Sequence, residues 1–187
     1  LFAQYALGQY LALPLTARRS RLVLVTAHRR ESFGEPFIQL CSGLRRLAIE
    51  NPALTLLYPV HLNPNVQQVV RQMLADQPNI HLLPPLPYET FCHVLQVADL
   101  VLTDSGGVQE EAPALGKPVL VLRNDTERPE GVVAGTAKLV GTDALLIVEN
   151  ALKLLQEPAA YQQMANAVSP YGDGHAAERI GGHLGGV

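Results

Sequence analysis

The amino-acid sequence predicts an α/β fold with a doubly wound, parallel β-sheet. Short apolar runs rich in branched side chains, such as residues 21–26 and 100–103, are typical of strands that are covered on both faces. Segments of helical periodicity separate these runs, and no hairpin signal joins any two of them. Strands that alternate with helices in this way form a parallel sheet with right-handed crossovers.

Length and composition restrict the function. A chain of 187 residues, of which 48% are hydrophobic and 17% charged, is most simply one globular domain. The net charge of -3 argues against a nucleic-acid partner, which would require a clustered basic excess. Since no apolar run is long enough to cross a membrane and no secretory signal is visible, we expect a cytoplasmic protein. The chain opens on Leu1 within a helical pattern, which suggests a fragment or a processed product.

The cysteine and histidine pattern predicts neither a disulfide nor a metal site. Cys41 and Cys92 lie singly in apolar, helical contexts, which favours buried free thiols in a reducing compartment. His81 and His93 have no partners at metal-ligand spacing, so we expect both to be structural. We therefore expect no metal and no cofactor.

The first half of the chain contains three predicted strands and four predicted helices. The strands cover residues 21–26, 54–58 and 80–83. The helices cover residues 2–13, 34–50, 65–75 and 88–98. One face of the second helix is apolar, through Phe37, Leu40, Leu44, Leu47 and Ala48. In the fourth helix, Phe91, Leu95 and Val97 are expected to belong mainly to the core.

The second half repeats this plan. Its strands are predicted over residues 100–103, 117–122 and 138–140. Its helices are predicted from the Ser-Gly-Gly turn to Leu115, from an Asp143 cap to about Gln156, over residues 158–167, and from about His175 onward.

The turn formed by Ser105, Gly106 and Gly107 is the first candidate for a binding site. Both glycines permit a positive φ and bring bare backbone N–H groups close to a ligand, while Ser105 can cap the following helix. A helix N-terminus stabilises an anion, so this turn suits phosphate. Glu110 and Glu111 follow in the first turns, where they could simply complement the helix dipole; we favour that interpretation for Glu110.

Charged or glycine-containing loops follow four of the predicted strands, at residues 28–31, 61–64, 105–111 and 123–130. They meet at one edge of a parallel sheet, where such folds bind ligands, which predicts a phosphorylated small molecule. A solvated charged loop is an equal alternative for residues 28–31, as is a histidine satisfied by loop carbonyls for His61. The Gly-x-Gly-x-x-Gly and Walker patterns of dinucleotide and nucleoside triphosphate sites are absent.

Six ordered motifs carry a resemblance to a known family. They are VTAHRRES (25–32), YPVHLNP (58–64), TDSGGVQEE (103–111), GKP (116–118), TERPE (126–130) and PYGDG (170–174). Together they resemble the C-terminal half of the non-hydrolysing UDP-N-acetylglucosamine (UDP-GlcNAc) 2-epimerases. The resemblance implies the Rossmann-like C-terminal domain of a glycosyltransferase B-type fold, with residues 1–187 as one nucleotide-binding domain and the N-terminal catalytic domain absent from this chain.

The same resemblance implies roles for individual residues. It places Ser105, Gly106 and Gly107 on the diphosphate, Glu111 on the ribose hydroxyls and Arg128 beside the nucleotide. Phe91 and the backbone around Leu86 would border the uracil. His28, as the catalytic residue of this chain, would face the diphosphate and C2 of the sugar, and Arg29 and His61 would help to form a second pocket for an activator.

The implied reaction is inversion at C2 of UDP-GlcNAc to UDP-N-acetylmannosamine, by elimination of UDP and its re-addition. The acid and base carboxylates lie on the N-terminal domain of the family, so the isolated chain is expected to be inactive. Its partners would be UDP-GlcNAc and UDP, with a homodimer in the full-length protein and a place in cell-surface polysaccharide biosynthesis. Two alternatives share the fold: a UDP-sugar glycosyltransferase or hydrolysing epimerase, and a non-catalytic UDP-binding module.

Overall fold

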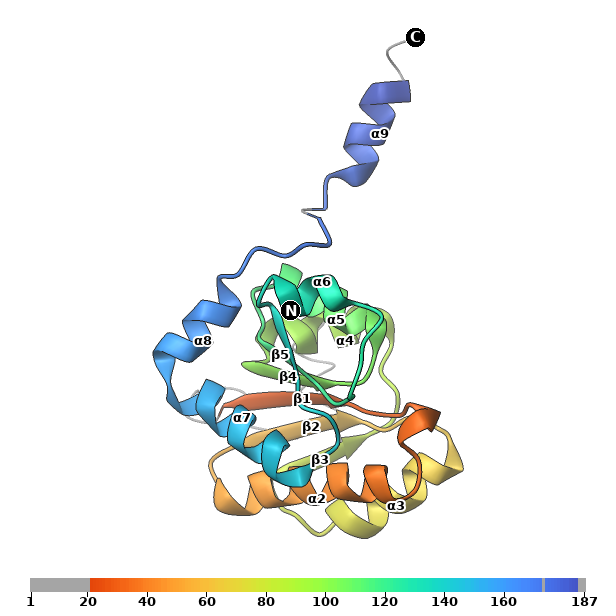
Figure 1. The fold of residues 1–187 in the computed structure, drawn as a ribbon. Helices are drawn as coiled ribbons and strands as arrows, with labels where there is room; N and C mark the ends of the chain where they lie inside the picture. The colour runs from red at the N-terminus through yellow and green to blue at the C-terminus, as the bar shows by residue number, and fades with distance from the viewer. Residues whose placement is uncertain (1–20, 173, 185–187) are drawn as a thin grey trace.

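A parallel six-stranded sheet forms the centre of the computed structural model, which describes residues 21–172 and 174–184 (Figure 1). The strands are β1 (Leu22–Thr26), β2 (Thr55–Pro59), β3 (Ile80–Leu83), β4 (Leu100–Thr103), β5 (Val119–Val121) and β6 (Ala137–Leu139). Their order across the sheet is β3-β2-β1-β4-β5-β6, and every neighbouring pair is parallel. The doubly wound α/β prediction is therefore confirmed.

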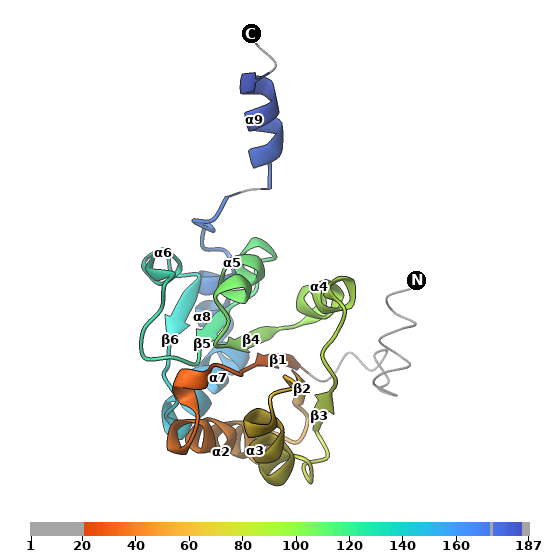
Figure 2. The same cartoon turned by 90° about the vertical axis from the view of Figure 1, so that its right-hand side faces the viewer.

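Helices cover both faces of the sheet, as the strand sequences require (Figures 1 and 2). One face packs on α2 (Glu35–Glu50), α3 (Pro64–Leu74) and α7 (Ala144–Gln156), and the other on α4 (Tyr88–Val97) and α5 (Gly106–Ala114). Along β1, Val23 and Val25 belong to the first core cluster, whereas Leu22 and Leu24 belong to the second. Because successive side chains point to opposite faces, a strand apolar throughout is buried on both sides.

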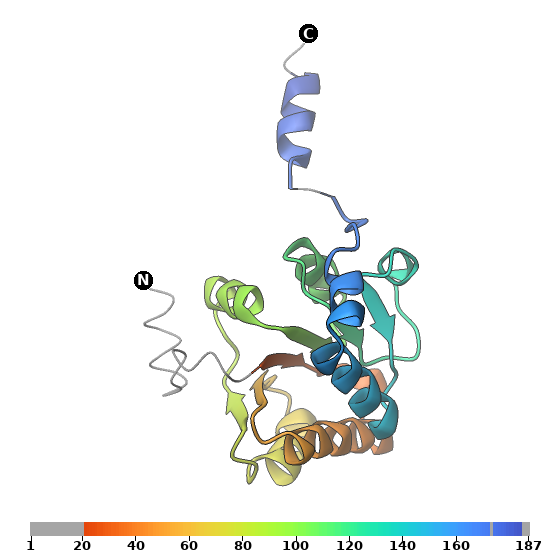
Figure 3. The ribbon, with the colours of Figure 1, turned by 90° about the vertical axis from the view of Figure 1, so that its left-hand side faces the viewer.

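The remaining helices are short or lie toward the C-terminus. They are the 3-10 helix η1 (Arg30–Ser32), α6 (Pro129–Val133), α8 (Pro158–Ala165) and α9 (Ala176–Leu184). Figures 1 and 3 show α9 standing away from the sheet and its helical layers. None of the described helices is long and apolar enough to cross a membrane.

The apolar face predicted for α2 is confirmed, since Phe37, Leu40, Leu44, Leu47 and Ala48 are each no more than 1% exposed. The predicted cap of α7 is also confirmed: the Asp143 side chain accepts hydrogen bonds from the backbone N–H groups of Leu145 and Leu146, both at 2.9 Å. This cap satisfies backbone N–H groups that would otherwise lack a partner within the helix.

Some sequence expectations differ from the structure. Val97 is 53% exposed, because it lies about 200° around the helix from the buried Leu95 rather than on the same face. Residues 129–133 form α6, whose first two residues were predicted as the end of the loop over residues 123–130. Cys41 is buried as expected, and burial raises the pKa of its thiol to about 12, but Cys92 is only partly buried. The lead-in helix predicted over residues 2–13 lies outside the described residues.

The strand order fixes where a ligand can bind. The chain winds outward in one direction from β1 to β3 and in the other from β4 to β6, so the order reverses between β1 and β4. Loops at the carboxyl ends of these two neighbouring strands lead to helices on opposite faces, which opens a crevice between them. The residues that follow Thr26 and Thr103 flank this point.

Candidate functional site

Asp104 joins the loop after β1 to the loop after β4. Its side chain is completely buried, and its Oδ2 accepts hydrogen bonds from the backbone N–H groups of His28 at 2.6 Å and Arg29 at 2.7 Å. At the ends of β1 and β4, the hydroxyls of Thr26 and Thr103 share a hydrogen bond of 2.6 Å. These bonds hold the two loops together at the strand-order reversal.

The loop after β2 joins them through a pair of stacked histidines. The His28 and His61 rings are nearly parallel, at 7°, with centroids 4.9 Å apart. Among the described residues, the hydrogen bond of the His61 ring is one that its Nδ1 accepts, at 3.1 Å, from the backbone N–H of Asn63, rather than one donated to a loop carbonyl. The predicted meeting of the loops that begin at His28, His61 and Ser105 is thus confirmed.

Burial and charge act in opposite directions on the His28 ring. Burial lowers the pKa of His28, the carboxyl of Asp104 raises it, and the cationic forms of His61 and Arg29 lower it further. Burial also raises the pKa of Asp104, against hydrogen bonds from the Arg29 and His28 backbones and the charge of His28. The free protein therefore favours a neutral His28 near pH 7.

The Ser-Gly-Gly turn lies beside this cluster and begins α5. Gly106 and Gly107 are its first two residues, and neither adopts the positive φ that a glycine permits. Because a glycine has no side chain, a ligand can reach the backbone here. The space beside Gly107 is open, since an added Cβ would meet no atom within 4 Å. The first N–H groups of α5 lack partners within the helix, so they can approach an anion here.

Ser105 is the N-cap residue of α5, but its side chain makes no capping hydrogen bond. Its backbone N–H donates to Oγ1 of Thr103 at 2.9 Å, and its carbonyl accepts from Nε2 of Gln109 at 3.3 Å. The expected cap is therefore wrong. Hydrogen bonds thus fix the backbone of Ser105, whereas its hydroxyl makes no capping hydrogen bond to α5.

Arg29 brings a guanidinium group to the same turn. A Cβ at Gly106 would lie 3.8 Å from Nη2 of Arg29, and Nη1 of Arg29 lies 4.0 Å from Oε1 of Glu127. Among the described residues, Glu127 is thus the acid that forms an ion pair with Arg29. Glu127 accepts two hydrogen bonds from Arg123, at 2.6 and 3.0 Å, which lower its pKa to about 2. It stays charged and holds Arg29 near the anion site.

The two predicted acids of α5 have different partners. Glu110 forms an ion pair with Nε of Arg128, and Oε1 of Glu111 lies 3.4 Å from the hydroxyl of Tyr88. The first turn of α5 contains no acid, because the helix begins at Gly106 and both glutamates fall one turn later. The interpretation of Glu110 as a first-turn acid is therefore wrong.

Arg128 is positioned by residues of the six motifs to which the sequence alone assigned no individual role. The hydroxyl of Tyr171 donates to the carbonyl of Arg128 at 3.2 Å and accepts from the N–H of Gly131 at 3.0 Å. Oγ1 of Thr126 accepts from the N–H of Arg128 at 3.0 Å and donates to Oε1 of Gln109 at 2.6 Å. Hydrogen bonds thus connect Tyr171 and the TERPE segment to α5.

The two residues expected at the uracil lie on the face of the sheet that α5 covers. Leu86 and Phe91 are partly buried and pack against the second core cluster. Phe91 also belongs to the first turn of α4, where its N–H donates to the carbonyl of Pro87 at 2.9 Å. Both side chains are therefore part core and part surface, which suits the wall of a base-binding site.

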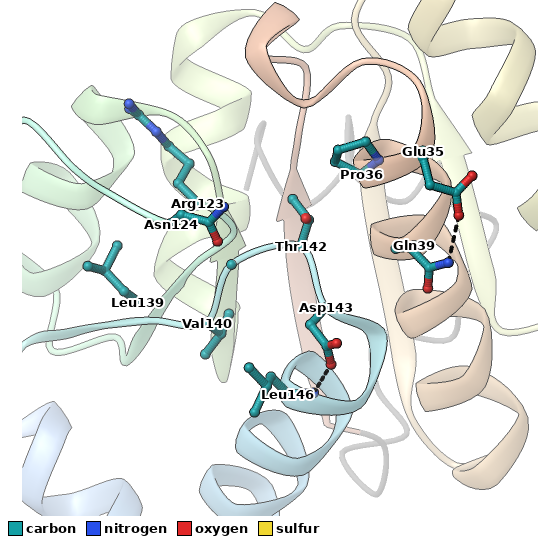
Figure 4. A pocket seen from close by; sticks show the side chains of 11 residues that line it. Glu35, Pro36, Gln39, Arg123, Asn124, Leu139, Val140, Thr142, Asp143 and Leu146 are labelled. Atoms are coloured by element: carbon teal, nitrogen blue, oxygen red, sulfur yellow. Dashed lines mark hydrogen bonds between the residues drawn. The ribbon is translucent and has the colours of Figure 1, made fainter.

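A separate pocket of about 540 Å³ lies along the same sheet edge, between the starts of α2 and α7 and the loops after β5 and β6 (Figure 4). Its lining includes Glu35, Gln39, Arg123, Asn124 and Asp143, together with Leu146. None of the residues predicted for the nucleotide lines it. The candidate site is thus defined by the loop residues, not by this pocket.

Comparisons with known proteins agree on one family. The family model described as UDP-N-acetylglucosamine 2-epimerase matches residues 5–185. A UDP-N-acetylglucosamine 2-epimerase from Campylobacter jejuni is 51% identical over 160 residues, which cover 86% of this chain and 42% of that protein. The chain spans about half the length of the curated relatives it matches, and it corresponds to their C-terminal half.

Solved structures show the same relationship. A UDP-GlcNAc 2-epimerase from Neisseria meningitidis, crystallised with UDP-GlcNAc, is 42% identical with a TM-score of 0.89, and the match covers 98% of this chain and 49% of that one. A Staphylococcus aureus protein, MnaA, solved with UDP, is 45% identical with a TM-score of 0.84, over 89% of this chain and 46% of that one. The Rossmann-like C-terminal domain of a glycosyltransferase B-type fold is confirmed, and this chain belongs to the UDP-N-acetylglucosamine 2-epimerase family.

Proposed function

We propose that this chain is the UDP-binding half of an isomerase that interconverts UDP-GlcNAc and UDP-N-acetylmannosamine. One observation carries the proposal: where the strand order reverses, the Arg29 guanidinium lies beside the start of α5, and the His28 ring lies beside Asp104, two residues before that helix. A helix N-terminus and a guanidinium together form a site for a diphosphate. The relatives from N. meningitidis and S. aureus, solved with UDP-GlcNAc and with UDP, support the same ligand.

In this proposal each motif residue contacts one part of the nucleotide. Ser105, Gly106 and Gly107 hold the diphosphate, and Arg128 lies beside the nucleotide, fixed by Glu110. Glu111 accepts hydrogen bonds from the ribose hydroxyls. Leu86 and Phe91 border the uracil from the edge of the second core cluster. His28, the catalytic residue of this chain, faces the diphosphate and the C2 region.

The reaction explains why this half is mainly an anion site. A base removes the C2 proton, the C1–oxygen bond breaks, and its electron pair leaves with UDP to give a glycal. Protonation of C2 on the other face, with attack of UDP on C1, gives the epimer. UDP must stay bound between the two steps, so donors directed at its oxygens stabilise the charge that develops as the bond breaks.

Three further features belong to the proposal for the full-length protein. Arg29 and His61 border a second, activator pocket, which would share Arg29 with the phosphate turn. The full-length protein forms a homodimer and acts in the cytoplasm, in cell-surface polysaccharide biosynthesis. The isolated chain is inactive because the acid and base carboxylates lie on the other domain.

Calorimetric titration of the isolated chain with UDP tests the proposal. We expect binding, because the phosphate turn, Glu111 and Arg128 all belong to one sheet with its own core. The affinity should be weak, because contacts from the other domain are missing. The absence of both a heat signal and a thermal shift at millimolar UDP would contradict the proposal.

Glu111→Gln should weaken the binding of UDP about tenfold but leave the binding of 2′,3′-dideoxy-UDP nearly unaffected. A charge-assisted hydrogen bond contributes about 1.5 to 3 kcal/mol, and the amide retains part of this as a neutral acceptor. The control is Glu149→Gln, which makes the same change on α7, on the opposite face of the sheet. If Glu111→Gln weakens both nucleotides equally, Glu111 acts through the fold and not on the ribose.

A further inference from the structure

Asp104 contains a buried polar atom that the rest of the fold does not explain. Its Oδ2 accepts two short backbone hydrogen bonds, but its Oδ1 is buried and has no hydrogen-bond partner among the described residues. A buried carboxylate oxygen left without a partner is costly, so such atoms are rare unless they have a function. The His28 ring lies close to this atom, with its Nδ1 3.6 Å from Oδ1.

We infer that Asp104 is a positioning residue for His28, which it holds with the proton on Nδ1. The inference rests on the proposed function, in which the ring faces the diphosphate. A distance of 3.6 Å is longer than a hydrogen bond, but such contacts in ligand-free sites often shorten when the substrate binds. With Nδ1–H directed at Asp104, Nε2 is the nitrogen left to face the leaving phosphate.

The groups around His28 support this tautomer. On its own loop, Arg29 lies nearby as a cation, and from the loop after β2 the His61 ring stacks on its face rather than on its edge. From the loop after β4, Asp104 is the one anion that acts on His28 among the described residues. An acceptor at Nδ1 fixes which nitrogen carries the proton of a neutral imidazole.

Substitution of Asp104 by asparagine reverses this preference. The single amide oxygen is needed to accept the N–H groups of His28 and Arg29, so the amide NH₂ faces the ring. Nδ1 must then accept a hydrogen bond, and the proton moves to Nε2. The pKa of His28 falls as well, because the variant lacks the carboxylate that raises it.

The experiment uses the ¹⁵N-labelled 187-residue chain and records two-bond ¹H–¹⁵N correlations of its histidine rings. The pH is high enough that the His28 ring is neutral. His28→Asn identifies the His28 signals among the six histidines. We expect the Nδ1–H tautomer in the wild type and the Nε2–H tautomer in Asp104→Asn. A wild-type ring protonated on Nε2 would overturn the inference, whether or not the variant folds.

Asp99→Asn is the matched control. Asp99 precedes β4 at the opposite edge of the sheet, where its Oδ2 accepts a hydrogen bond of 2.8 Å from the N–H of Leu22. The same acid-to-amide change there should leave the His28 tautomer unchanged, and a switch in both variants would overturn the inference. Titration of the same samples with UDP tests the proposed function separately. UDP binding with a wild-type Nε2–H ring would contradict only the role of Asp104.

Discussion

Gly107→Asp is expected to weaken UDP binding by about 10²-fold or more while the chain becomes slightly more stable. Gly107 is the second residue of α5, and the space beside it is open, so the new side chain fits without strain. Its carboxylate would lie about 5 Å from a bound phosphate, where two like charges repel by about 3 kcal/mol at the effective dielectric constant of a protein surface. The same charge stabilises the helix N-terminus by about 0.5 kcal/mol.

The opposite signs of these two effects make the test specific. Calorimetry would measure the affinity for UDP, and urea denaturation would measure the free energy of unfolding. Gly181→Asp is the control, since Gly181 lies in α9 and an added Cβ would likewise meet no atom within 4 Å. A Gly107→Asp chain that binds UDP as tightly as the Gly181→Asp chain would place the diphosphate elsewhere.

The sheet was predictable because its strands are short and apolar on both faces. Six runs of branched side chains, separated by helical periodicity, define parallel strands without knowledge of their order in space. The errors fall at short elements. Five residues form α6 after Arg128, too few for helical periodicity to be visible, and Val97 ends a helix whose apolar positions do not continue to it.

The site was predictable at the level of loops. Polar residues that follow buried strands in a parallel sheet lie at one edge, which correctly brings together the loops that begin at His28, His61 and Ser105. The motif resemblance then gave individual residues their roles, which the tests above examine. The sequence indicates which loops meet but not which side chains pair, and only the structure shows that Glu127 contacts Arg29.

Asp104 and Tyr171 show what sequence reasoning missed. Asp104 directly follows an apolar strand and precedes a glycine turn, and a carboxylate at such a position is a signal for a buried, hydrogen-bonded anchor. Tyr171 lies about 40 residues beyond the Arg128 loop, and only the three-dimensional path of the chain brings its hydroxyl to the Arg128 carbonyl. Contacts of this kind depend on exact distances, which residue spacing does not provide.

The proposed location of the acid and base carboxylates on another domain leads to the last prediction. The isolated chain should not exchange the C2 proton of UDP-GlcNAc with solvent, however well it binds UDP. A base within hydrogen-bond reach of a proton supplies a rate factor of about 10² to 10⁴. His28 is the titratable group that the proposal puts near the sugar. A bound diphosphate favours its protonated form, against the burial that lowers its pKa in the free chain. A protonated His28 steadies the leaving group and cannot also act as the C2 base.

The experiment incubates the chain with UDP-GlcNAc in deuterated water and follows the C2 position by NMR. The full-length C. jejuni epimerase, which is 51% identical over the matched residues, is the positive control. We expect exchange by the isolated chain to be at least about 10²-fold slower than by that enzyme. Exchange that appears only after a separately expressed N-terminal half is added would support the division of labour. Deuterium incorporation by the chain alone, abolished by His28→Asn, would instead make His28 the base and place the C2 chemistry on this half.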